Sequence, residues 1–206
     1  MMLRDVVYDY LWKQIKDKQF MPGAFVDLNF IAKRLNVSRT PLREAFIILE
    51  NEGFVVILPK KGIYIKPLTL QDTHYLYEII GSLESAIVMN EWSKINPEHI
   101  ETMEGHNEEM GKCTDHAQHY EMNRKFHFIY IQLSENQELR QQLSRLYQRI
   151  YDFSGMNYGR RFQQNNCNGH REFIHLLKKG KRLEAADYLR DTHWKFRAIE
   201  AFTGGY

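Results

Sequence analysis

The chain has little cysteine, with only Cys113 and Cys167 among its 206 residues. Two distant cysteines exclude a disulfide framework and suit a reducing compartment. The sequence also lacks any apolar run close to the ~20 residues that a membrane helix needs. Its N-terminus has no apolar stretch of the kind found in signal peptides. We therefore expect a cytoplasmic protein with no membrane partner.

Positive charge is only slightly in excess, with a formal net charge of +2. Its distribution is uneven, because residues 1–66 hold eleven Lys and Arg against seven Asp and Glu. The first third thus carries +4 and the remainder −2. The apolar share of 43% is enough for a buried core. A basic first third before a mildly acidic remainder is typical of a nucleic-acid-binding module joined to a second domain.

The most specific motif is the segment Asn36–Phe46, which predicts a turn followed by a recognition helix. Ser38 suits the N-cap because its hydroxyl can accept a hydrogen bond from a first-turn N–H. Pro41 falls in the first turn, where a missing N–H costs little. Arg39 and Arg43 lie one turn apart, beside an apolar face formed by Leu42, Ala45, Phe46 and Leu49. Guanidinium groups bind guanine edges or phosphates, so this helix is predicted to contact duplex DNA.

The flanking residues extend this motif to a winged helix-turn-helix. Helices are expected over 5–18 and 27–35, and two strands over 54–58 and 63–65. Pro59-Lys60-Lys61-Gly62 lies between the strands as a basic turn, so the hairpin reads as a wing. The alternative is a structural helical subdomain with solvated arginines, but the order helix, helix-turn-helix and wing favours DNA binding.

A boundary is expected near residues 66–69, where Pro67 interrupts the strand pattern. We assign residues 1–66 to the winged helix-turn-helix, 67–69 to a linker and 70–206 to an all-α domain. Six helices are predicted there, over 70–93, 97–112, 115–133, 136–157, 161–179 and 181–202. The fold class is therefore mainly α, with a six-helix bundle as the second domain.

The first domain resembles the GntR family of bacterial transcription regulators. The resemblance rests on Pro22-Gly23, the run Val37–Ala45, Leu49-Glu50, Glu52-Gly53 and Gly62. It implies a homodimer that binds a near-palindromic operator through the recognition helix and the wing tip. It implies DNA-contacting roles for Ser38, Arg39, Thr40, Arg43 and Gly62. Lys60 and Lys61 are added to this surface from their charge and position.

Nine histidines lie beyond residue 73, and three of them occupy the apolar faces of predicted helices. His127, His170 and His193 would converge if these faces meet in the bundle core. Asn123 is one turn before His127 and shares its face. Neutral imidazole is a common metal ligand, so the spacing suggests a metal site. The spacing equally fits buried histidines that hydrogen-bond to neighbours.

Residues 70–206 resemble the ligand-binding domain of the FadR-type (FCD) branch, in its shorter VanR-like form. The residues that carry the resemblance are Leu83-Glu84, Phe126-His127, Ser134-Glu135-Asn136, Gly169-His170-Arg171-Glu172 and His193. Members bind a divalent metal through one aspartate and three histidines, and the metal helps to hold a small carboxylate. The histidines map onto His127, His170 and His193, and the aspartate onto Asn123. Zinc, nickel or manganese is thereby implied.

The sequence departs from the branch in two places. Asn123 brings no negative charge to a metal, and Ile79-Ile80-Gly81 stands where an effector-pairing arginine is usual. Candidate substitutes that could contact the effector are Arg197, Arg145, Arg149 and the hydroxyl of Tyr147.

These patterns together predict a cytoplasmic, homodimeric DNA-binding transcription regulator, acting as a repressor. Its helical domain would sense a small molecule, such as an organic acid, at a divalent-metal site. One alternative is the same regulator with a metal-free, histidine-lined sensor cavity. Another is a metalloenzyme that uses His127, His170 and His193. No well-placed Glu or Asp stands out as its general base, so we expect no enzyme.

Overall fold

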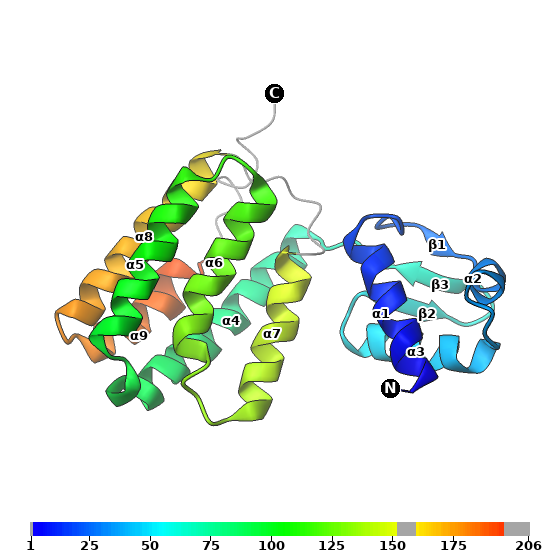
Figure 1. Cartoon of the computed structure of the whole chain (residues 1–206), viewed down its shortest axis with the longest axis horizontal. Helices are drawn as coiled ribbons and strands as arrows, with labels where there is room; N and C mark the ends of the chain where they lie inside the picture. The colour runs from blue at the N-terminus through cyan, green and yellow to red at the C-terminus, as the bar shows by residue number, and fades with distance from the viewer. Residues whose placement is uncertain (1, 152–159, 196–206) are drawn as a thin grey trace. The chain divides into compact units, whose positions relative to one another are not determined.

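The computed structural model describes residues 2–151 and 160–195 and contains two compact units. The first unit ends at Thr69 and the second begins at Leu70, apart from a short stretch at the end of α7 that is grouped with the first. The mainly helical fold class predicted from the sequence is confirmed, as Figure 1 shows. Within the described residues, no helix is both long and apolar enough to cross a membrane.

The first unit is a winged helix-turn-helix. Its helices are α1 (Leu3–Lys16), α2 (Leu28–Leu35) and α3 (Arg39–Asn51), and its strands are β1 (Phe25–Val26), β2 (Val55–Leu58) and β3 (Gly62–Ile65). The strands form an antiparallel sheet in the order β1-β3-β2 (Figure 1). Strands β2 and β3 are the predicted wing, and Leu58 pairs with Gly62 beside its turn. The two-residue strand β1 was not predicted, because it is too short to show an alternating pattern.

The core of this unit forms where the apolar faces of the three helices meet the sheet. Leu42, Ala45, Phe46 and Leu49 of α3 are all at most 1% exposed, as their spacing predicted. They pack with Val7 and Leu11 of α1 and with strand residues such as Ile63 and Ile65. This packing fixes the outward orientation of the opposite face of α3.

One detail of the recognition helix differs from the expectation. Ser38 is the N-cap of α3, with extended backbone angles (φ −70°, ψ 170°), but its side chain makes no capping hydrogen bond. Helix α2, by contrast, has a side-chain cap of its own, because Asp27 accepts from the backbone N–H groups of Asn29 and Phe30. The Ser38 hydroxyl is exposed and stays available to an external partner.

The second unit is helical throughout its described residues. It comprises α4 (Leu70–Glu91) with a short 3₁₀ turn (Trp92–Lys94), α5 (Pro97–Lys112), α6 (His116–Ile131), α7 (Gln137–Tyr151), α8 (Arg160–Lys178) and α9 (Arg182–Tyr188). The predicted start signals are confirmed for α5 and α7. Asn96 accepts from the N–H of His99, and Asn136 accepts from the N–H of Leu139.

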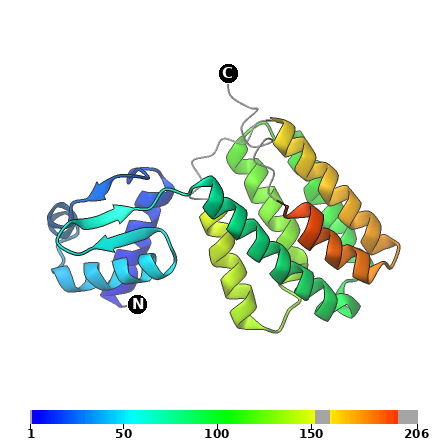
Figure 2. The same cartoon turned by 180° about the vertical axis from the view of Figure 1, so that it is seen from behind.

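The prediction of one regular helix over residues 181–202 was wrong. Helix α9 stops at Tyr188 and continues as a π-helical turn, Leu189–His193, in which the N–H of Trp194 bonds to the carbonyl of Leu189 at 3.1 Å. The extra residue per turn rotates the side chains that follow, so a strict helical period misplaces them. Figure 2 shows α9 alongside α4, with which the π turn also packs. Residues 196–202 lie outside the described residues.

Candidate functional site

The outer face of α3 carries the side chains predicted to contact DNA. Ser38, Arg39, Thr40 and Arg43 are all exposed, whereas the opposite face of the helix is buried. Arg39 and Arg43 are one helical turn apart, so both guanidinium groups lie on the same side. This arrangement suits a helix that enters the major groove with its N-terminal residues first.

Arg39 is held by a residue that the sequence reasoning missed. Its Nη2 donates to the Oδ1 of Asn29 at 2.7 Å, across the turn between α2 and α3. Both residues are exposed, so the contact adds orientation more than stability. It restricts the rotamers of a long side chain in advance of binding, which lowers the entropy that ordering it would cost. In the sequence, the polar residue Asn29 on the exposed face of α2 could have indicated this role.

The wing tip is built around two positive backbone angles. Lys60 has φ +64° and Gly62 has φ +112°. Residues with a Cβ rarely adopt the φ angle found at Gly62, which explains why a glycine stands at this position. Lys60 and Lys61 are exposed on the turn. The hairpin therefore presents two lysines at its end, a suitable source of phosphate contacts.

The second unit brings three histidines together from three separate elements. His127 lies on α6, His170 on α8 and His193 at the end of the π turn. The Nε2 atoms of His127 and His170 are 3.1 Å apart, and those of His127 and His193 are 3.3 Å apart. The first two residues are fully buried. The convergence predicted from their helix faces is thus present in the structure.

The other ring nitrogens fix the direction in which two of these imidazoles face. Nδ1 of His170 lies 3.1 Å from Oδ1 of Asn107, whose own amide nitrogen donates to the carbonyl of Cys167 at 3.1 Å. The Asn107 oxygen is therefore an acceptor, and His170 donates to it through Nδ1–H. Neutral His170 then carries a lone pair on Nε2.

His127 is fixed by an ionised carboxylate on α4. Its Nδ1 lies 3.1 Å from Oε2 of Glu84 and 2.8 Å from the hydroxyl of Tyr130. Donation from Nδ1–H to this acceptor leaves the lone pair on Nε2, as in His170. Two such lone pairs, on nitrogens 3.1 Å apart, repel unless a metal ion or a proton lies between them. A carboxylate behind a histidine is a common outer shell of metal sites.

Glu84 is fully buried, and its oxygens are saturated with donors. Oε2 accepts from Tyr130 at 2.6 Å and from Nε1 of Trp194 at 2.6 Å, and Oε1 accepts from Tyr147. Burial raises the pKa of Glu84, but the interaction with His127 and the hydrogen bonds outweigh it and lower that pKa below its usual value. The negative charge is therefore retained at the centre of the bundle.

Two of the three histidines, His170 and His193, are held in the neutral form that metals require. Burial, and then the other histidines, lower the pKa of His170 well below its usual value. Burial is also the largest cause that lowers the pKa of His193 to about 3. At neutral pH these two imidazoles have no proton to release before they bind a metal.

The geometry fits a tetrahedral or similarly compact metal ion. Bonds of about 2.0–2.1 Å to imidazole, at tetrahedral angles, place two ligand nitrogens roughly 3.3–3.4 Å apart. The observed separations of 3.1 and 3.3 Å are close to this value. The three ligand atoms all lie within 4.8 Å of one another. The cluster can hold a divalent metal, and its three-nitrogen set leaves coordination positions for other donors.

The remaining candidates lie in varied places. Asn123 is buried on α6, one turn before His127. Tyr147 is buried and donates to Glu84, so it belongs to the network behind His127. On α7, Arg145 is exposed and Arg149 is half-buried. Arg197 lies outside the described residues.

Packing excludes an arginine at position 81 of α4. A Cβ at Gly81 would lie 2.9 Å from the Cβ of Trp194 and 3.2 Å from the carbonyl oxygen of Leu189. Contacts below 3.0 Å require atoms to move, so the position admits only glycine without rearrangement. The indole of Trp194 thus packs where α4 comes closest to the π turn, and its N–H binds Glu84.

Gly169→Ala is expected to weaken metal binding by about 10- to 100-fold, as loss of an outer-shell partner does. A Cβ at Gly169 would lie 2.8 Å from Nδ1 of His193, so this imidazole would have to move. Titration calorimetry with zinc measures the effect. Gly105→Ala is the matched control, because a Cβ on this helical glycine of α5 has no atom within 4 Å. Equal zinc affinity in both variants would show that His193 does not ligate.

Comparisons with known proteins agree with this architecture. The GntR family of bacterial regulatory proteins matches residues 3–65, and the FCD domain matches residues 75–193. The HTH-type transcriptional regulator YdhC of Bacillus subtilis (strain 168) is 30% identical over 184 residues, which cover 87% of this chain and 82% of YdhC.

A second relative and a solved structure extend the comparison. The HTH-type transcriptional repressor RspR of Escherichia coli (strain K12) is 25% identical over 134 residues, covering 64% of this chain and 59% of RspR. The structure of Lar, described as controlling expression of the Listeria monocytogenes agr system, has a TM-score of 0.66 at 20% identity. It covers 98% of this chain and 97% of Lar. At that identity the likeness concerns the fold.

Proposed function

We propose that this chain, which belongs to the GntR family and carries an FCD domain, senses a small molecule through a divalent metal held by His127, His170 and His193. The family makes it a DNA-binding transcription regulator and not an enzyme. The observation that carries the proposal is the pair of facing Nε2 atoms 3.1 Å apart. Both Nδ1 atoms lie next to acceptors, which leaves the two Nε2 atoms free to bind a metal ion.

In this proposal the DNA-contacting residues are Ser38, Arg39, Thr40, Arg43, Lys60, Lys61 and Gly62. The exposure of the helix residues and the two lysines supports it. We place the DNA-binding domain at residues 1–66, a linker at 67–69 and the sensing and dimerisation domain from residue 70. The protein would act in the cytoplasm as a homodimer on a near-palindromic operator. The similarity to RspR favours repression.

The helical domain is assigned to the VanR-like group because six α-helices follow the wing in the described residues. The metal would be zinc, nickel or manganese, with Asn123 as a fourth, neutral oxygen ligand. Arg145, Arg149 and Arg197 remain candidates for contact with an anionic effector. The metal-free sensor is the alternative, in which hydrogen bonds among the buried histidines suffice.

The proposal predicts that metal and a small carboxylate change operator affinity. Fluorescence anisotropy with DNA from upstream of the protein's own gene would compare metal-free protein, zinc-loaded protein, and zinc-loaded protein with citrate or malate. Coupling between two sites amounts to about 1–3 kcal/mol, so we expect a 5- to 150-fold change in affinity. Equal operator affinity in all samples would contradict the proposed metal-linked sensing.

Asn123→Asp is expected to tighten zinc binding about tenfold or more. An ionised carboxylate adds a full negative charge next to a dication, where an amide offers only a dipole. The metal-free variant should be less stable, because it buries a carboxylate at a position that is only 2% exposed. Calorimetry and thermal melts with and without chelator measure both effects, with the exposed Asn90→Asp as control. Unchanged zinc affinity would remove Asn123 from the ligand set.

A further inference from the structure

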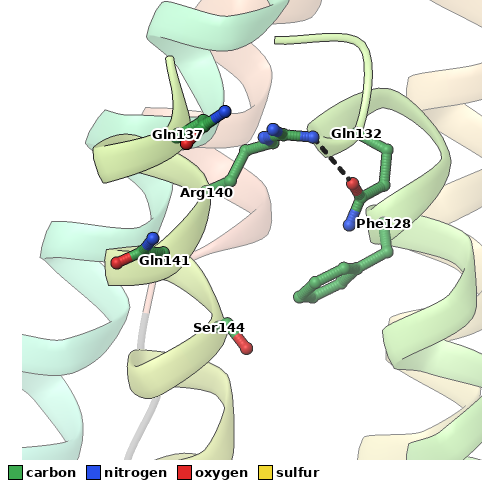
Figure 3. A pocket seen from close by; sticks show the side chains of 6 residues that line it. All are labelled: Phe128, Gln132, Gln137, Arg140, Gln141 and Ser144. Carbon is green, nitrogen blue, oxygen red and sulfur yellow. Dashed lines mark hydrogen bonds between the residues drawn. The ribbon is translucent and has the colours of Figure 1, made fainter. Parts of the chain in front are cut away.

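A second site lies outside the histidine cluster, in a pocket between the end of α6 and the start of α7 (Figure 3). Its volume is about 270 Å³, and its lining is Phe128, Gln132, Gln137, Arg140, Gln141 and Ser144. The four residues from α7 follow the spacing i, i+3, i+4, i+7, which places them on one helix face. That face is polar, whereas Leu143, Tyr147 and Ile150 form the buried face beside it.

Arg140 gives the pocket its charge. Its Nη1 donates to Oε1 of Gln132 at 3.1 Å, the dashed line in Figure 3. The Nε–H of Arg140 is buried and makes no hydrogen bond. No carboxylate pairs with this guanidinium in residues 2–151 and 160–195. No acidic residue contributes to the lining of the pocket either. A guanidinium that has no carboxylate partner can pair with an anionic ligand through its terminal nitrogens.

The other side of the pocket is aromatic. The ring of Phe128 points across the gap toward Ser144 and α7 (Figure 3). Its position is fixed by edge-to-face packing on Tyr147, with ring centroids 5.4 Å apart. The guanidinium of Arg124 lies over this ring, 5.7 Å from its centroid, and Phe128 and Arg140 line the pocket from α6 and α7. The amides of the glutamines and the Ser144 hydroxyl provide further donors around them.

We propose that this pocket binds a small organic carboxylate that has a flat apolar part. The carboxylate would accept from the terminal nitrogens of the planar Arg140 guanidinium. The flat part would lie on the ring of Phe128. A volume of about 270 Å³ admits a molecule of the size of benzoate. The site shares no side chain with the histidine cluster, so it does not depend on a bound metal.

Benzoate is the probe, titrated into the full-length protein by ligand-observed NMR and calorimetry. We expect one site per chain, and at least tenfold weaker binding of benzamide, which keeps the ring but loses the charge. Arg140→Gln should weaken benzoate binding about tenfold or more. Arg171→Gln is the matched control, because it makes the same change of residue at an exposed arginine of α8 outside the pocket. Its benzoate affinity should stay within about twofold of the native value.

Gln137→Glu provides an independent variant that keeps Arg140 and the fold. Glutamate at the first position of α7 is favourable there, and at i, i+3 it can pair with the Arg140 guanidinium and compete with the ligand. Benzoate affinity should again fall about tenfold. The proposal is overturned if native protein binds no benzoate at millimolar concentrations, if benzamide binds equally well, or if neither Arg140→Gln nor Gln137→Glu weakens binding.

Discussion

His170→Ala is expected to leave the purified, untagged protein without tightly bound divalent metal. The alanine removes one of three converging nitrogens and releases Asn107, which orients the ring. Loss of an outer-shell partner alone costs 10- to 100-fold in metal affinity, so loss of a ligand should cost roughly 100-fold or more. Elemental analysis and zinc calorimetry measure this. Chelator should lower the melting temperature of the native protein and leave that of the variant unchanged.

The control must separate loss of a ligand from loss of a buried ring. His119→Ala serves this purpose, because His119 is 1% exposed on α6, with its Nδ1 near the carbonyl of Met110, and is not one of the three clustered histidines. Both variants lose buried ring volume and should be destabilised by it. Only His170→Ala should lose metal. One equivalent of zinc bound with native affinity by His170→Ala would contradict the metal site.

The double variant Arg39→Ala, Arg43→Ala is expected to lose nearly all operator binding. Each arginine that reads a base edge contributes about 1–3 kcal/mol, so the pair should cost roughly 30-fold to 10⁴-fold if the two act independently. Should both contact phosphate, affinity would fall for all DNA sequences, and the salt slope would shrink by about one per arginine. Both residues are exposed, so the fold should tolerate the change.

Anisotropy titrations with operator and random DNA at several salt concentrations distinguish these outcomes. The double variant Arg124→Ala, Arg171→Ala is the control, since both are exposed arginines of the helical domain and their loss makes the same change in net charge. The single variant Asn29→Ala should show a smaller loss than Arg39→Ala, because it frees the Arg39 side chain without removing it. Native affinity in the double variant would place the DNA surface elsewhere.

The DNA-binding fold was readable from the sequence because its signals are local. The recognition helix has a start signal at Ser38, a first-turn proline and an apolar face, all within thirteen residues. The wing needs only two short strands and a turn. The same holds for α5 and α7, whose caps Asn96 and Asn136 lie next to the helices that they begin. Such features depend on backbone geometry over a few residues.

The sequence suggested the histidine cluster but did not establish it. Periodicity placed three imidazoles on apolar helix faces, but whether the faces meet depends on how the helices pack. Glu84 could have been noticed, because it is a charged residue within the buried face that includes Tyr77, Ile80 and Ile87. The sequence did not show that its carboxylate would collect donors from α6, α7 and the π turn.

The sequence by itself therefore determined the family, the positions of most helices and of the wing, and the residue types at the DNA surface and the histidine cluster. Tertiary structure alone decided which side chains touch. A π turn replaced the regular helix predicted around His193, and the packing of the bundle brought His193 to His127 and Trp194 to Glu84. Gly81 and Gly169 acquired their roles from atoms that lie more than twenty residues away in the chain. The physical reason is that periodicity specifies a direction around one helix axis, whereas a distance between side chains depends on two or more axes at once.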